Sequence, residues 1–129
     1  MQKILVVDDK ATSRELLRSV LENEGYIVVE AADGLEAIQK AHAEGPALIL
    51  LDLQLPLRSG YEVLNELRRD PQFATPPVIA LTASAMQGDQ EKALAAGFTA
   101  YLTKPVALRH FRLEIKRILQ SGEASAGTI

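Results

Sequence analysis

The stretch ALILLDLQLP, Ala47 to Pro56, begins with five consecutive apolar residues and then places an aspartate, Asp52. A short continuous apolar run is typical of a strand that is buried on both faces of a parallel sheet. A carboxylate at the end of such a strand is costly to bury unless it is paired, protonated or bound to a metal. The stretch therefore predicts a buried strand over residues 47–51 and a set of partners around Asp52.

The bulk composition is that of one compact domain. The chain has 129 residues, of which 47% are hydrophobic and 24% charged. It contains no cysteine, which excludes disulfides, thiol catalysis and cysteine-ligated zinc and fits a reducing compartment. The net charge of −3 argues against nucleic acid as the main partner, and no apolar run is long enough to span a membrane. We therefore expect a cytoplasmic protein that binds neither nucleic acid nor a membrane directly.

Strand-like runs alternate with helical patterns along the chain. Further strands are predicted at residues 3–7, 26–31, 77–83 and 100–104. Helices are predicted at residues 11–25, 33–45, 59–70, 87–97 and 107–119. This alternation predicts an α/β fold, a doubly wound five-stranded parallel sheet with helices on both faces. We expect the domain to cover residues 1–121 and the small-residue segment 122–129 to be a disordered tail.

Local signals mark the helix starts and their inward faces. Capping boxes are predicted for Thr12 with Glu15 and for Ser59 with Glu62, and Asp33 is predicted to cap the second helix. The helical period predicts that one apolar stripe on each helix faces the core. The inward residues are Leu16, Leu17, Val20, Leu21, Leu35, Ile38, Leu64, Leu67, Leu108, Phe111, Ile115, Ile118 and Leu119, while the fourth helix offers only Ala93, Leu94 and Ala96.

Polar residues follow four of the predicted strands. These residues are Asp8 and Asp9, Asp52, Thr82, and Lys104. Sites in doubly wound sheets form beyond the carboxyl ends of the strands, so these side chains are expected to gather at one edge. Two carboxylates ~4 Å apart repel by ~4 kcal/mol at an effective dielectric constant of ~20, so a cluster of three needs cations. Lys104 offsets part of this repulsion, and an all-oxygen site suits Mg²⁺. A carboxylate beside Mg²⁺ and lysine is also suited to attack phosphorus.

Four motifs carry a resemblance to a known family. VVDD (6–9), LLDLQLP (50–56), LTAS (81–84) and YLTKP (101–105) occur in an order and spacing that resembles the receiver domain of two-component response regulators. The match runs from about residue 3 to residue 119. The segment 81–106 most resembles single-domain regulators of the cell-division type and receivers of hybrid sensor kinases. The resemblance implies a flavodoxin-like (βα)5 fold with strand order 2-1-3-4-5.

The resemblance also implies a metal-dependent phosphoacceptor. Asp52 would accept a phosphoryl group from a phosphohistidine on a partner protein. Asp9, Asp52 and the backbone carbonyl of Gln54 would bind Mg²⁺, with Mn²⁺ as an alternative ion, and Asp8 would act through bound water. Lys104 would contact the phosphoryl group.

Further roles implied by the resemblance concern switching and dephosphorylation. Thr82 would swing toward the phosphoryl group, and Tyr101 would turn inward into the space that Thr82 leaves. Lys104–Pro105 would be a cis peptide. Gln54 and Ser84 would flank the attacking water and tune dephosphorylation. The acidic residue that the family often has before the glycine at residue 60 is absent, because the run here is LRSG.

The expected partners follow from the same resemblance. A sensor histidine kinase or a His-containing phosphotransfer protein would donate the phosphoryl group. A downstream protein would bind the face made by the fourth helix, fifth strand and last helix. The protein would catalyse only its own phosphorylation and dephosphorylation, without acting as a turnover enzyme, and would be a monomer or weak dimer. Roughly ten residues follow the last helix, too few for a DNA-binding output domain.

Several alternatives remain open from the residues alone. Asp8 and Asp9 are also good N-capping residues, Tyr101 is also an ordinary core aromatic, and Lys104–Pro105 is also compatible with a trans turn. An aspartyl-phosphate phosphatase of the haloacid-dehalogenase class needs an acid where Gln54 stands, and a cap domain that this length does not fit. A flavodoxin-like cofactor site is disfavoured because two acids follow the first strand. A pseudo-receiver that keeps the fold but takes no phosphoryl group is the remaining alternative.

Overall fold

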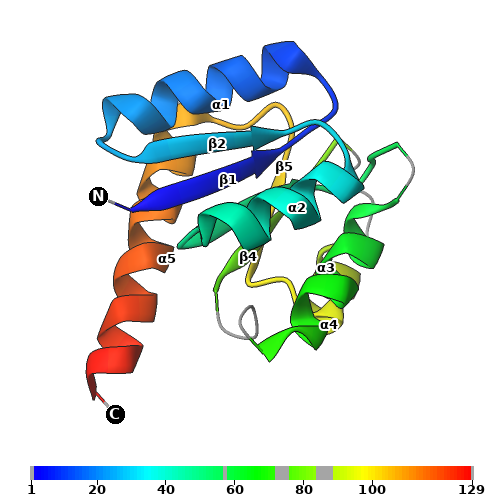
Figure 1. The fold of residues 1–129 in the computed structure, drawn as a ribbon. Coiled ribbons are helices and arrows are strands. Elements are labelled where there is room, and N and C mark those ends of the chain that lie inside the picture. Colours follow the sequence, from blue (N-terminus) through cyan, green and yellow to red (C-terminus); the bar gives the residue numbers. More distant parts are fainter. Residues whose placement is uncertain (1, 57, 72–75, 84–88, 129) are drawn as a thin grey trace.

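The computed structural model describes residues 2–56, 58–71, 76–83 and 89–128 (Figure 1). Strands and helices alternate along them as the sequence predicts. The strands are β1 (Lys3–Val7), β2 (Ile27–Ala31), β3 (Leu48–Asp52), β4 (Val78–Thr82) and β5 (Ala100–Thr103). The helices are α1 (Ala11–Asn23), α2 (Gly34–Glu44), α3 (Gly60–Arg69), α4 (Asp89–Ala96) and α5 (Leu108–Thr128).

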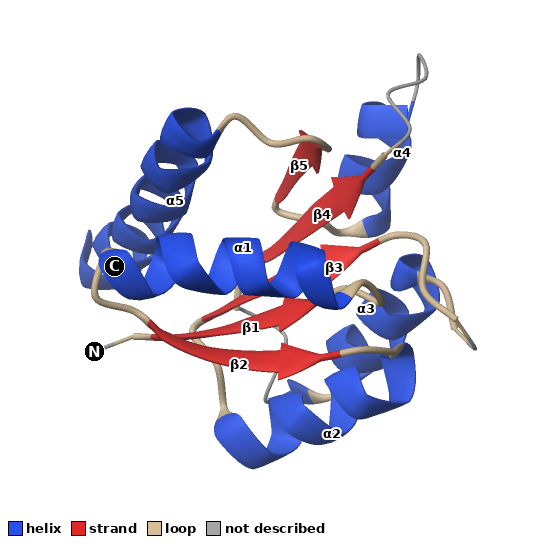
Figure 2. Cartoon of the chain, turned by 90° about the horizontal axis from the view of Figure 1, so that it is seen from above, coloured by secondary structure: helices blue, strands red, loops and turns tan. Residues whose placement is uncertain are grey.

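The five strands form one parallel sheet in the order β2-β1-β3-β4-β5. This is the predicted fold class and strand order. Helices α1 and α5 cover one face of the sheet, and α2, α3 and α4 cover the other (Figure 2). Every residue of β3 and β4 is buried, which explains their continuous apolar sequences.

Two of the three predicted helix caps are present. The Asp33 side chain accepts from the Glu36 N–H over 2.8 Å, and Ser59 and Glu62 form both bonds of a capping box. The predicted box of Thr12 and Glu15 is wrong. Helix α1 begins at Ala11 with Lys10 as its N-cap, so Thr12 lies inside the first turn instead of before it. The Arg14 N–H, which a Thr12 hydroxyl at an N-cap could have bound, donates to the Lys10 carbonyl.

The predicted inward faces are mostly correct, but four of the residues are exposed: Leu16, Leu35, Leu94 and Ala96. Leu16 and Leu35 are 50% and 49% exposed, because the apolar stripes of α1 and α2 are wider than the arc that meets the sheet. On α4 the buried face is narrower than predicted, since Ala93 is buried while Leu94 and Ala96 are exposed.

The last helix continues past the apolar pattern that ends at Leu119. The structure assigns helix as far as Thr128. The domain boundary at residue 121 and the disorder of 122–129 stay predictions. Across the residues described here, no helix combines the length and apolar character needed to cross a membrane.

Candidate functional site

The parallel register brings the polar strand ends to one edge of the sheet. Val7 of β1 lies opposite Leu51 of β3, so the next residues on the two strands, Asp8 and Asp52, are neighbours. Thr82 of β4 lies opposite Thr103 of β5, and Lys104 is the residue after Thr103. Asp8, Asp52 and Thr82 are all buried. The structure thus brings together Asp8, Asp52, Thr82 and Lys104, which come from the ends of four separate strands.

Lys104 ties two of the carboxylates together. Its Nζ donates to Asp8 Oδ2 over 2.6 Å and to Asp52 Oδ2 over 2.8 Å. Burial disfavours the charged form of Lys104, but the hydrogen bonds to Asp52 and Asp8 outweigh it and hold the pKa of the ammonium above its ordinary value. Lys104 is therefore a charged, fixed cation at the centre of the site.

The second oxygen of each paired carboxylate is also fixed. The Lys10 N–H donates to Asp8 Oδ1 over 3.0 Å, and the Gln54 N–H donates to Asp52 Oδ1 over 2.9 Å. Both bonds run from the backbone two residues further along the chain, as in Asx turns. The orientations of Asp8 and Asp52 are therefore set by backbone and lysine together.

Asp9 completes an acidic cluster that suits a metal ion. Asp8, Asp9 and Asp52 each offer a carboxylate oxygen, and these oxygens lie within 4.8 Å of one another. Asp9 is exposed, and no group among the described residues donates a hydrogen bond to its carboxylate. Lys104 pairs with Asp8 and Asp52, and among the described residues no other ion pair is formed by the three carboxylates, so the cluster retains negative charge. Its all-oxygen donor set fits Mg²⁺.

An arginine that the sequence analysis missed also contacts this region. Arg14 Nη1 donates to the Asp8 carbonyl oxygen over 2.7 Å, and its Nε donates to Glu30 Oε1 over 3.1 Å. Glu30 Oε2 accepts from Arg18 Nη1 over 2.9 Å. The end of β2 thus contributes Glu30 to the contacts around the paired aspartates. Two features of the sequence could have indicated this contact. Arg14 lies in the first turn of the helix after Asp8 and Asp9, and the acidic Glu30 lies near the end of the neighbouring strand β2.

The switch and tuning residues predicted from the sequence have different surroundings in the structure. Tyr101, on β5, is partly buried against the core on the α2–α3–α4 face, and burial raises the pKa of its hydroxyl. The Gln54 side chain is exposed. The Lys104–Pro105 peptide is cis. Ser84 lies outside the described residues.

The start of α3 packs directly on the backbone of Asp52. The Gly60 N–H donates to the Leu53 carbonyl over 3.0 Å. A Cβ at Gly60 would lie 2.6 Å from the Asp52 carbonyl oxygen and 2.8 Å from Leu53 Cα. Because real Cβ atoms do not approach backbone this closely, only glycine fits here.

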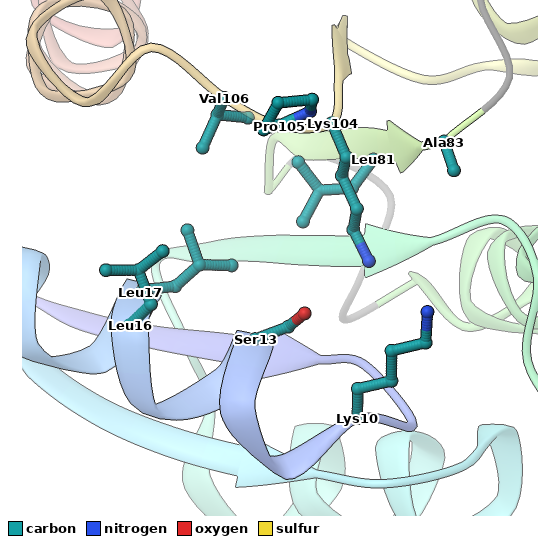
Figure 3. Close-up of a pocket in the computed structure, with 9 residues that line it drawn as sticks. All are labelled: Lys10, Ser13, Leu16, Leu17, Leu81, Ala83, Lys104, Pro105 and Val106. Carbon is teal, nitrogen blue, oxygen red and sulfur yellow. The ribbon is translucent and has the colours of Figure 1, made fainter.

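A cavity of about 370 Å³ opens beside the cluster, between α1 and the segment that follows β5. Lys10 and Lys104 extend toward the same space from its two sides (Figure 3). Leu16 lines the cavity, so its side chain faces this opening instead of the core. Of the described residues that form the site, only Lys104 lines this cavity.

Comparisons with known proteins agree with this geometry. Residues 4–116 match the family model of the response regulator receiver domain. The polar-differentiation response regulator DivK of Brucella anthropi is 39% identical over 118 residues, which cover 92% of this chain and 96% of that protein.

Two solved structures extend the comparison. A CheY-like response regulator receiver domain protein of Methanospirillum hungatei superposes with a TM-score of 0.89 at 32% identity, covering 97% of this chain and 98% of that one. The receiver domain of a sensor histidine kinase of Pseudomonas aeruginosa has a TM-score of 0.79 at 38% identity, covering 93% and 95%. Its crystal structure holds a magnesium ion coordinated in the active site cleft.

Proposed function

The chain belongs to the response-regulator receiver family of two-component signalling, and from this premise we propose that Asp52 is its phosphoacceptor. The observation that carries the proposal is the Asp52 carboxylate at the end of β3, bound by Lys104 and close to two further carboxylates. In the reaction an Asp52 oxygen forms a bond to phosphorus while the P–N bond of a phosphohistidine breaks. The imidazole leaves with the electron pair and takes up a proton.

Asp9 and Asp52, with the Gln54 carbonyl, would hold Mg²⁺, and Asp8 would act through bound water. The carboxylate oxygens within 4.8 Å of one another support this ligand set, as does the magnesium ion in the Pseudomonas aeruginosa receiver. When bound, the ion supplies positive charge that offsets the charge of the phosphoryl oxygens. Mn²⁺ is an alternative ion for the same ligands.

Lys104 and Thr82 would contact the phosphoryl group. The ammonium of Lys104 already lies 2.8 Å from Asp52 Oδ2, and Thr82 ends the neighbouring strand β4. The new group adds about −1.5 to −2 charge, which attracts both side chains. Thr82 would move toward it, Tyr101 would turn inward, and the equilibrium between two arrangements of α4 and β5 would shift.

The remaining roles concern partners and signal lifetime. A sensor histidine kinase or a His-containing phosphotransfer protein would donate the phosphoryl group in the cytoplasm, and a downstream protein would bind the α4–β5–α5 face. Gln54 and Ser84 would set the rate of dephosphorylation. The receiver would catalyse these two reactions on itself alone and act as a monomer or weak dimer.

Intact-mass measurement after incubation with acetyl phosphate and Mg²⁺ tests the phosphoacceptor. We expect one added phosphoryl group that is labile to hydroxylamine and absent without metal or in Asp52→Asn. Asp33→Asn is the matched control, because Asp33 caps α2 and does not belong to the acidic cluster. A wild-type protein that gains no mass under these conditions is a pseudo-receiver, and the proposal is then wrong.

Thr82→Ala tests the switch separately from the chemistry. The variant should still gain the phosphoryl group but respond weakly in partner binding, because the hydroxyl that pulls β4 and α4 is gone. Thr103→Ala is the matched control, since Thr103 is exposed and lies opposite Thr82 in the sheet register. An undiminished response of the Thr82 variant contradicts the switch role.

A further inference from the structure

We propose that Arg14 is a positioning residue for the metal site, because its guanidinium fixes the peptide that joins Asp8 to Asp9. The inference rests on the proposed function, since it takes Asp9 as a metal ligand. Arg14 Nη1 donates to the Asp8 carbonyl oxygen over 2.7 Å. That carbonyl shares a peptide plane with the Asp9 N–H, so the bond sets the direction in which the Asp9 backbone leaves β1.

Arg14 is itself held in place by the neighbouring strand. Its Nε donates to Glu30 Oε1 over 3.1 Å, and only 18% of its side chain is exposed. A planar guanidinium carries donors in a rigid fork, so it can serve the Asp8 carbonyl and the Glu30 carboxylate at the same time. A chain of contacts therefore runs from β2 through Arg14 to the peptide before Asp9.

Asp9 depends on its backbone more than the other two aspartates do. Asp8 and Asp52 have both carboxylate oxygens fixed by Lys104 and by backbone N–H groups. The Asp9 carboxylate has no hydrogen-bond donor in the part of the chain that the structure describes, and it faces two like charges. Repulsion favours turning Asp9 away, and the peptide held by Arg14 opposes this.

The chain offers a matched control in Arg18. Arg18 donates to the other oxygen of the same Glu30 carboxylate and pairs with Glu22, and half of its side chain is exposed. Arg14→Gln and Arg18→Gln remove the same charge from α1 and one partner from Glu30. Only the first removes the bond to the Asp8 carbonyl, so comparing the two separates positioning from charge.

Mg²⁺ titration of the unphosphorylated full chain by calorimetry tests the inference without using activity. Arg14→Gln should raise the Kd for Mg²⁺ by about tenfold, as is typical when a group that orients a metal ligand is removed. Arg18→Gln should change it by less than about twofold. In the metal-free protein, the NMR resonance of the Asp9 amide should shift in the Arg14 variant and stay in place in the Arg18 variant. Urea unfolding in the presence of EDTA measures the stability of the metal-free Arg14→Gln and Arg18→Gln variants, so that a loss of folding is told apart from a loss of Mg²⁺ binding.

Two further variants decide the matter if Arg14→Gln does not fold. Arg14→Lys has one compact ammonium in place of the fork, and Glu30→Gln keeps an oxygen acceptor but loses the charge that anchors Arg14. Each should weaken Mg²⁺ binding by several-fold. Wild-type affinity together with an unmoved Asp9 resonance, in Arg14→Gln or in both of these variants, overturns the inference.

Failure of this inference is distinguishable from failure of the proposed function. A wild type that binds Mg²⁺ and gains the phosphoryl group, with an Arg14 variant that binds Mg²⁺ as tightly as the Arg18 variant, overturns only the role of Arg14. A wild type that gains no phosphoryl group overturns the phosphoacceptor. A wild type that does not bind Mg²⁺ overturns both.

Discussion

Helices α4 and α5 cover the β4–β5 side of the sheet from opposite faces, and they are attached to it very differently. Helix α5 buries four large side chains against the sheet, namely Phe111, Ile115, Ile118 and Leu119. Helix α4 buries Ala93 alone among its side chains. Full burial of a large apolar side chain contributes about 1.5–3 kcal/mol, so α5 is held by several such contributions and α4 by a single methyl group.

The difference identifies which element can respond to a change at Asp52. A segment with few buried apolar contacts opens at low free-energy cost, whereas a well-packed helix moves only when the fold opens. Tyr101 lies between them on β5, partly buried on the α4 side. We therefore expect α4 and β5 to move on phosphorylation while α5 remains a fixed support.

The largest expected effect is on the α5 side. Phe111→Ala leaves a cavity where a fully buried ring was, and it should lower the free energy of unfolding by about 3–5 kcal/mol. Urea denaturation measures this loss. Leu113→Ala is the control on the same helix, because Leu113 is 58% exposed and should cost less than about 0.5 kcal/mol. If Phe111→Ala and Leu113→Ala lower the free energy of unfolding equally, the buried face of α5 does not hold the helix more firmly than α4 is held.

The next effect concerns the packing of α3 on β3. Gly60→Ala forces the Asp52 backbone to shift, and it should cost about 1–3 kcal/mol and slow phosphorylation by acetyl phosphate. Gly25→Ala is the control: its φ of 91° strains an alanine, but a Cβ there meets nothing within 4 Å. That variant should lose stability and keep the phosphorylation rate. A normal rate in the Gly60 variant contradicts the coupling of α3 to Asp52.

A smaller effect is expected on α4. The Lys92 ammonium lies 5.2 Å from the centroid of the Tyr61 ring on α3, a cation–π contact that is worth about 0.5–1 kcal/mol at an exposed site. Lys92→Met should speed amide hydrogen exchange within α4 and leave global unfolding nearly unchanged. Lys92→Arg keeps the contact and should behave as wild type. Slower or unchanged exchange in the methionine variant means that α4 is held by something else.

The smallest effect lies on α2, far from both helices. The Ile38 carbonyl and the Asp70 carboxylate both accept from the His42 ring, and they raise the pKa of His42 above its ordinary value. Because the folded state favours the charged ring, the stabilisation is complete below the unfolded pKa of about 6.5 and is lost as pH rises through the higher folded value.

Urea midpoints of wild type and His42→Asn at about pH 5.5 and about pH 8.5 measure this contribution. The advantage of the wild type should shrink at the higher pH. Glu66 also faces His42 and favours its charged form, so Glu66→Gln in the presence of His42 should reduce the pH-dependent advantage. In the His42→Asn variant, Glu66→Gln should have no further effect on the pH dependence of this site. An advantage that grows with pH contradicts the expected sign.

Local sequence signals predicted the strands well because each buried strand needs a continuous apolar run. Ser59 with Glu62 was also predictable, since both partners of that capping box lie within one turn. Thr12 with Glu15 has the same spacing but failed, because Asp8 accepts from the Lys10 N–H and α1 starts before Thr12. Spacing alone does not reveal where the preceding loop ends.

The acidic cluster was predictable for a different reason. Parallel strands end at one edge, so Asp8, Asp52 and Lys104 had to meet once the alternation of strands and helices was read. The link from Arg14 to the Asp8 carbonyl was not predictable, because its acceptor is a backbone atom that leaves no trace in the sequence. The role of Glu30 was likewise not predictable, because its hydrogen bonds to Arg14 and Arg18 depend on how α1 packs beside β2.

The bond between Lys104 and Asp8 joins groups that are 96 positions apart in the chain. During synthesis on the ribosome, the first strand, its aspartates and Asp52 all emerge before the lysine that completes their pocket. A growing chain therefore contains three acids without their cation until β5 has left the exit tunnel. Because β5 is the last strand of the sheet, this bond can form only after all five strands have been synthesised.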